Sequence, residues 1–115
     1  MDWLEKIFDE QIDRQNKINN CDSYGLNLKE VYNSATAAIV ELGEMLQADT
    51  RWKPFITKSK KPPVCDEEKF LEEWSDAFIY MLNVLIYYGA SIKDIKLAIE
   101  NKMRINKERF NETVN

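Results

Sequence analysis

Apolar residues recur at three- and four-residue spacings in four separate stretches of this 115-residue chain, and no stretch alternates as a half-buried strand would. Turn-forming residues or prolines separate the stretches; Asn27 is suited to start a helix and Gly89 to end one. The stretches cover residues 2–19, 28–48, 67–88 and 92 into the C-terminal region. We therefore predict an all-α fold in which residues 1–115 form a single domain, the four-helix subunit of a helical bundle.

The same spacing predicts which side of each helix is buried. The third helix is apolar nearly all round and should be the most buried. It has more apolar surface than one small core can cover, so we expect the chain to oligomerise. The second helix carries one apolar face, formed by Leu28, Val31, Tyr32, Ala35, Ile39, Leu42 and Leu46. The fourth helix is expected to direct Ile92, Ile95, Ile99 and Met103 inward.

Residue types that many active sites require are missing or scarce. The chain has no histidine, which excludes histidine-dependent nucleophilic catalysis and histidine-ligated zinc or di-iron sites. Its three glycines are too dispersed for a glycine-rich phosphate loop. The net charge of −4 argues against nucleic acid as the partner, although the 50–63 segment is basic. Any chemistry must use carboxylates, amides, lysine, arginine or a hard metal ion.

The N-terminal segment is acidic and amphipathic, which is not typical of a secretory signal. The longest apolar run, residues 77–90, is interrupted by Asn83 and is shorter than the ~20 residues that span a bilayer. Cys21 and Cys65 fit no metal-binding motif. We expect a cytoplasmic protein without membrane contact, whose cysteines are reduced structural thiols.

Two acidic pairs stand in otherwise apolar parts of the predicted helices, Glu41 with Glu44 and Glu73 with Asp76. Residues three apart share a helix face. Two carboxylates ~5 Å apart repel each other by about 3 kcal/mol at an effective dielectric constant of 20, so four that converge would require cations. Magnesium suits them, because it takes carboxylate oxygens and is usually completed by water and phosphate. The alternative is that both pairs lie on solvated faces.

The ExxE and ExxD pairs, at 41–44 and 73–76, resemble the signature of the all-α nucleoside triphosphate pyrophosphohydrolases, which include the MazG proteins and the dimeric dUTPases. The resemblance implies a MazG/dimeric-dUTPase-like bundle shared by two subunits. It also implies that Glu41, Glu44, Glu73 and Asp76 bind the Mg²⁺ that holds a triphosphate, with Glu41 and Glu44 in catalytic roles.

Three further segments resemble the dimeric dUTPase branch: QNKIN at 15–19, RWKPF at 51–55 and KMRINKER at 102–109, with departures at Pro54, Met103 and Phe110. The resemblance implies that amides of the first helix read the uracil edge and that an aromatic and basic residues hold the rest of the nucleotide. The implied substrate-binding residues are Asn16, Asn19, Trp52, Lys53, Lys102, Asn106 and Arg109.

The residues alone leave a structural alternative open for each of these segments. Asparagines near a helix end are often caps, loop aromatics are often buried, and cations suit the C-terminal turns of a helix. The leading prediction is hydrolysis of dUTP to dUMP and pyrophosphate, with Mg²⁺ as cofactor, by a homodimer or a tetramer of dimers. The alternatives are a MazG-like enzyme for other or modified nucleoside triphosphates, and a non-catalytic helical module that binds a protein.

Overall fold

The computed structural model describes residues 1–53 and 62–114, the last three by their backbone alone. The elements are α1 (Trp3–Asn19), α2 (Leu28–Ala48), α4 (Glu67–Tyr88) and α5 (Ile92–Val114), and the described residues contain no strand beyond an isolated bridge between Asp49 and Cys65. The predicted all-α class is confirmed. Within these described residues, no helix is both long enough and apolar enough to cross a membrane.

Polar side chains cap the helices close to where the sequence marked their ends. The side chains of Asn27, Asp66 and Ser91 each accept a hydrogen bond from the backbone N–H three residues later, at the starts of α2, α4 and α5. Gly89 ends α4 with φ +82°, in the left-handed region that favours glycine. Local sequence therefore accounts for the helix boundaries.

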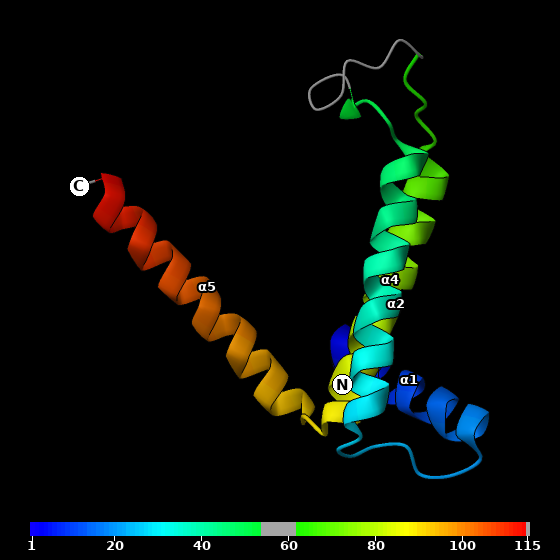
Figure 1. The fold of residues 1–115 in the computed structure, drawn as a ribbon. Coiled ribbons are helices and arrows are strands. Elements are labelled where there is room, and N and C mark those ends of the chain that lie inside the picture. The colour runs from blue at the N-terminus through cyan, green and yellow to red at the C-terminus, as the bar shows by residue number, and fades with distance from the viewer. Residues whose placement is uncertain (54–61, 115) are drawn as a thin grey trace.

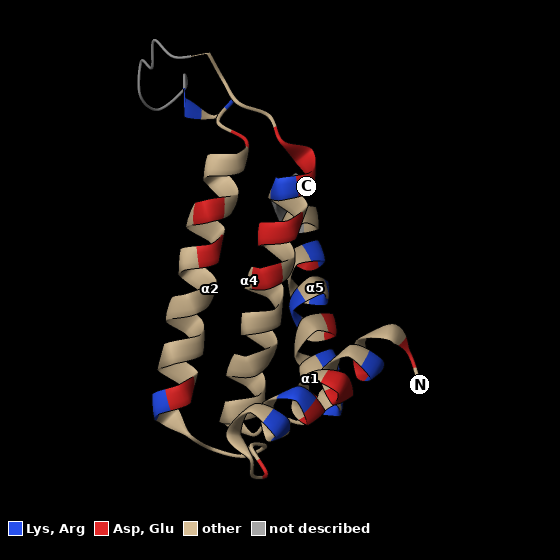
Figure 2. Ribbon diagram, turned by 90° about the vertical axis from the view of Figure 1, so that its right-hand side faces the viewer, with Lys and Arg blue, Asp and Glu red and all other residues tan. Residues whose placement is uncertain are grey.

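The helices α2 and α4 lie antiparallel and side by side (Figures 1 and 2), and α1 crosses α4 near its C-terminal end. α5 turns away after Gly89 and diverges from the other helices (Figure 1). A small core forms where α1, the end of α4 and the start of α5 meet. Its buried members are Phe8, Leu82, Ile86 and Ile95, surrounded by Leu4, Ile7, Ile12, Phe78, Leu85, Ala90 and Ile92.

The apolar residues of α2 share one face of the helix, as the sequence predicts, but most of that face is exposed, including Ile39 with 69% of its surface accessible. α4 packs against a different face of α2, where Ser34 and Ala38 are buried and their small side chains let the two helices approach closely. The exposed residues of the stripe are Leu28, Tyr32, Ile39, Leu42 and Leu46.

The prediction for α5 holds only at its start. Ile95 is buried, whereas Ile99 and Met103 are exposed because the helix has already left the core at these positions. α4 has more buried residues than any other described helix, as expected, yet one of its faces stays open. Cys21 and Cys65 are unpaired and exposed, so neither packs into the core as the expected structural thiol would.

Candidate active site

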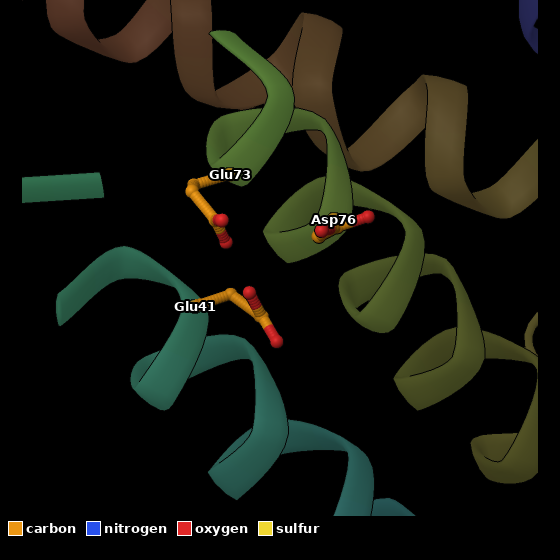
Figure 3. Close-up of side chains that lie close together, drawn as sticks. All are labelled: Glu41, Glu73 and Asp76. Carbon is orange, nitrogen blue, oxygen red and sulfur yellow. The ribbon is translucent and has the colours of Figure 1, made fainter. Parts of the chain in front are cut away.

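Three carboxylates meet between α2 and α4. One oxygen from each of Glu41, Glu73 and Asp76 lies within 4.8 Å of the other two. Glu41 and Glu73 point toward each other from facing helices, and Asp76 lies beside them one turn along α4 (Figure 3). The close antiparallel packing of α2 and α4 brings these acids together, although more than thirty positions separate Glu41 from Glu73 in the sequence.

Glu73 is the buried member of the acid cluster, with only 4% of the residue exposed. Its Oε1 pairs with Nζ of Lys69 at 2.7 Å, and its Oε2 is buried without a hydrogen-bond partner among the described residues. An unpartnered buried carboxylate oxygen is costly. Together with the oxygens of Glu41 and Asp76, it forms a donor set that fits a small hard cation such as Mg²⁺.

The pKa values of Glu41 and Glu73 are shifted in opposite directions. The pKa of Glu41 is raised to about 7, chiefly because its protonated form can donate a hydrogen bond to Glu73, with desolvation and the charge of Glu44 adding to the shift. The pKa of Glu73 is lowered, first by its hydrogen bond to Lys69. Glu73 therefore keeps its charge in the metal-free protein, whereas Glu41 exchanges a proton near neutral pH.

Glu44, the fourth acid of the predicted set, lies outside this three-residue cluster. It is exposed and lines a neighbouring cavity of about 420 Å³ together with Gln47, Lys69 and Glu73. The structure therefore places Glu44 next to the cluster and on the side of Lys69.

A larger cleft of about 750 Å³ opens on the other side of the acids. Its volume is within the range of small-molecule sites. Glu41 and Asp76 line it together with residues of α1, α2 and α4 that are mostly polar. The other lining residues are Gln11, Arg14, Gln15, Ile18, Glu30, Asn33, Ser34, Ile79, Tyr80, Asn83 and Tyr87.

The amides of this cleft are held in place by one another and by Tyr87. Nε2 of Gln11 donates to Oδ1 of Asn83 at 2.8 Å, and both residues are buried. The hydroxyl of Tyr87 donates to Oε1 of Gln15 at 2.6 Å. Gln11 and Asn83 are not among the residues predicted from the sequence, whereas Gln15 begins the QNKIN segment that resembles the dimeric dUTPases. The signal for Asn83 was present, because it interrupts the apolar run of α4, and Gln11 continues the buried side of α1 one turn after Phe8.

Asn16 and Asn19, the predicted base-reading residues, line other cavities than the cleft with the acids. Oδ1 of Asn16 accepts from the backbone N–H of Ser23 at 2.7 Å. Nδ2 of Asn19 donates to the hydroxyls of Ser23 and Tyr87, each at 2.8 Å. Both side chains therefore form hydrogen bonds with the turn that follows α1.

Trp52 and Lys53 lie just after α2. Nε1 of Trp52 donates to the carbonyl of Leu46 at 2.8 Å, and Nζ of Lys53 contacts Gln47 at 3.2 Å. Lys53 is therefore next to the cavity that Glu44 lines. Pro54, Phe55 and the lysines at 58, 60 and 61 lie outside the described residues.

Lys102, Asn106 and Arg109 are exposed along α5. Because α5 diverges from α2 and α4, the fold of one chain does not bring them to the acid cluster (Figure 1). These side chains could reach the acids only if α5 changed its position or if a second chain supplied them.

The sequence matches the family dUTPase_2, described as dUTPase, over residues 3–114. The chain belongs to this dUTPase family. Membership in the dUTPase family, together with the all-helical fold, supports a nucleoside triphosphate pyrophosphohydrolase of the all-α, MazG-like superfamily. No curated protein and no solved structure matches the chain.

Proposed function

We propose that this protein hydrolyses dUTP to dUMP and pyrophosphate in an Mg²⁺-dependent reaction, in the 750 Å³ cleft between α1, α2 and α4. The observation that carries the proposal is that Glu41 and Asp76 line the same cleft as the buried amide pair of Gln11 and Asn83. A nucleotide bound there would have its base at the amides and its phosphates at the acids.

The residues of the cluster have distinct roles in this proposal. Glu41, Glu73 and Asp76 would hold Mg²⁺, with Glu44 beside them as the fourth acid that the family resemblance implies. Bound Mg²⁺ would neutralise the phosphate oxygens and the charge that develops on them. Glu41, which lines the cleft, would orient or deprotonate the attacking water.

We assign base recognition to Gln11 and Asn83 in place of Asn16 and Asn19, because only the first two line the cleft with the acids. Amides present both donors and acceptors to a pyrimidine edge. A site built to hydrogen-bond one edge rejects bases that leave its polar groups unpaired.

A homodimer is the second part of the proposal. With the half-buried Ala35 included, the stripe of α2 repeats at alternating four- and three-residue steps, which is the spacing of a coiled-coil seam, at Leu28, Tyr32, Ala35, Ile39, Leu42 and Leu46. α4 carries a second such stripe at Leu71, Trp74, Phe78, Met81, Leu85 and Tyr88. Phe78 and Leu85 also pack against the core, and the other four residues of this stripe are exposed. Two seams on adjacent helices suit packing against the same two helices of a second copy, which would complete a four-helix bundle.

In such a dimer, α5 of one copy would extend toward the other. We propose that Lys102, Asn106 and Arg109 bind the triphosphate held by the partner copy, since α5 leaves its own cleft (Figure 1). Mixing an Asp76→Asn chain with an Arg109→Ala chain should then restore activity that neither variant has alone. Mixtures no more active than the separate variants would place both residues in one chain's site.

The decisive experiment is a panel of nucleoside triphosphates assayed for pyrophosphate release with and without Mg²⁺. We expect dUTP to be the best substrate and turnover to require the metal. Preference for another nucleotide would favour the MazG-like alternative. No hydrolysis, combined with no Mg²⁺-dependent nucleotide binding in calorimetry, would favour a helical protein-interaction module.

A further inference from the structure

Lys69 is a cation placed directly against the buried acid of the cluster. Its Nζ lies 2.7 Å from Oε1 of Glu73, whose side chain is 5% exposed, whereas the side chain of Lys69 is 51% exposed. One oxygen of Glu73 is thus taken by the lysine, while the other is buried without a partner. Among the described residues of the metal-free chain, the ammonium group of Lys69 is the cation that pairs with Glu73.

The position of Lys69 in α4 is unfavourable for a lysine by itself. It lies in the first turn, where its backbone N–H donates to the capping side chain of Asp66 at 3.0 Å. The positive end of the helix dipole disfavours a cation there, and the other charged residues of this turn, Glu67 and Glu68, are acidic. The acid cluster one turn later therefore explains this lysine better than helix stability does.

The lysine also has room to leave. Lys69 and Glu73 both line the 420 Å³ cavity that Glu44 and Gln47 share. If Glu73 were neutralised by another cation, the ammonium group could turn into this cavity toward Glu44 without disturbing the backbone of α4, because lysine has four rotatable bonds.

We propose that Lys69 is an internal counter-ion of the acid cluster, which neutralises Glu73 in the metal-free protein and is displaced when a divalent cation binds. This rests on the metal-binding role given to the cluster in the proposed function. Lys69 thereby lowers the affinity for the cation and keeps the metal-free cluster folded. An ordinary exposed ion pair four residues apart on a helix would do neither to a measurable extent.

The test uses the full chain without nucleotide. Mg²⁺ is titrated into wild type and Lys69→Met by calorimetry, and the melting temperature of each is measured in EDTA and at saturating Mg²⁺. We expect Lys69→Met to bind Mg²⁺ roughly five- to tenfold more tightly than wild type does. The effect should be at the low end of the usual range of coupling between two sites, because the side chain of Lys69 is half-exposed. We also expect Lys69→Met to have a lower melting temperature than wild type in EDTA. Saturating Mg²⁺ should raise its melting temperature by more than it raises that of wild type.

Two further variants make the result specific. Lys69→Arg keeps the charge and should behave like wild type. Lys29→Met removes an exposed lysine from the first turn of α2, so it controls for the helix dipole away from the acids and should leave Mg²⁺ affinity unchanged. Lys69→Gln replaces Lys69→Met should the latter fail to fold.

The outcomes separate this proposal from the one on which it rests. Equal or weaker Mg²⁺ binding by Lys69→Met, with normal binding by wild type, would overturn the counter-ion role and leave the proposed function standing. No Mg²⁺ binding by either chain would overturn the metal site and the counter-ion role together.

Discussion

Nε2 of Gln11 donates a 2.8 Å hydrogen bond to Oδ1 of Asn83, a residue 72 positions later, in the buried wall of the cleft that ends at Glu41 and Asp76. This bond joins α1 to α4 through two amides that are each less than one tenth exposed. It ties the orientation of α1 to the helix that carries two of the three clustered acids.

Breaking this amide pair should destabilise the protein. Gln11→Leu or Asn83→Leu alone should lower the free energy of unfolding by about 1–3 kcal/mol, because each leaves a buried amide without its partner. The double variant should lose less than the sum of the two, since neither amide then remains unpaired. Urea unfolding followed by circular dichroism measures all three, and strictly additive losses would contradict the coupling.

Loss of a clustered acid should abolish turnover without unfolding the chain. Asp76→Asn should reduce kcat by at least about 10²-fold, the effect expected when stabilisation of transition-state charge is lost. The matched control is Glu72→Gln, an exposed acid on the same helix outside the cluster, which should stay near wild-type rates. Wild-type rates in Asp76→Asn, with Mg²⁺ still required, would rule out this site.

Glu44→Gln tests the fourth acid separately, because Glu44 lies beside the cluster and not within it. The family resemblance predicts loss of turnover in this variant too. We expect the substitution to disturb melting in EDTA less than Glu73→Gln does, since Glu44 is exposed and Glu73 is buried and ion-paired. Thermal melts of the two variants beside pyrophosphate assays give both comparisons.

The stability of the metal-free protein should fall as pH rises toward neutrality. The pKa of Glu41 is about 7 in the folded chain against an ordinary value of 4.5, so the folded state binds more protons than the unfolded state between these values. The stabilisation is complete below pH 4.5 and is lost as pH rises through 7. Melting temperatures in EDTA across this range measure it.

Glu41→Gln should flatten that pH dependence, whereas Glu68→Gln, an exposed acid in the first turn of α4, should preserve it. Glu73 and Asp49 have lowered pKa values, so the stability that they contribute is lost only at more acidic pH. Their titration therefore does not affect the melting temperature between pH 4.5 and 7. A melting temperature that rises between pH 4.5 and 7 in wild type would contradict the assignment to Glu41.

A charge placed in the α2 seam should break the proposed dimer. Ile39→Asp lies in the exposed stripe, and a buried unpaired carboxylate at an interface is strongly unfavourable. Val40→Asp is the matched control, because Val40 is also exposed, at 54%, but points away from the stripe on the same helix. Light scattering should give a monomer for Ile39→Asp and a dimer for Val40→Asp. A monomeric wild-type protein would contradict the proposed dimer.

The sequence by itself determined the helices and the spacing of the acids. Caps such as Asn27 and Gly89 act through hydrogen bonds and dihedral angles within a few residues, and three-residue spacing places Glu73 and Asp76 on one face whatever the rest of the chain does. Local interactions decide these features, so they can be predicted from local sequence.

Only the tertiary structure decided which faces meet. The α2 stripe with Ile39 reads as a core face, because periodicity does not tell packing within a chain from packing against a second one. α4 packs instead against the face of α2 that carries the small side chains of Ser34 and Ala38. Because this face meets α4, Glu41 lies close to Glu73. The pairing of Gln11 with Asn83 likewise depends on how α1 crosses α4, a relation between segments far apart in the chain that no local pattern contains.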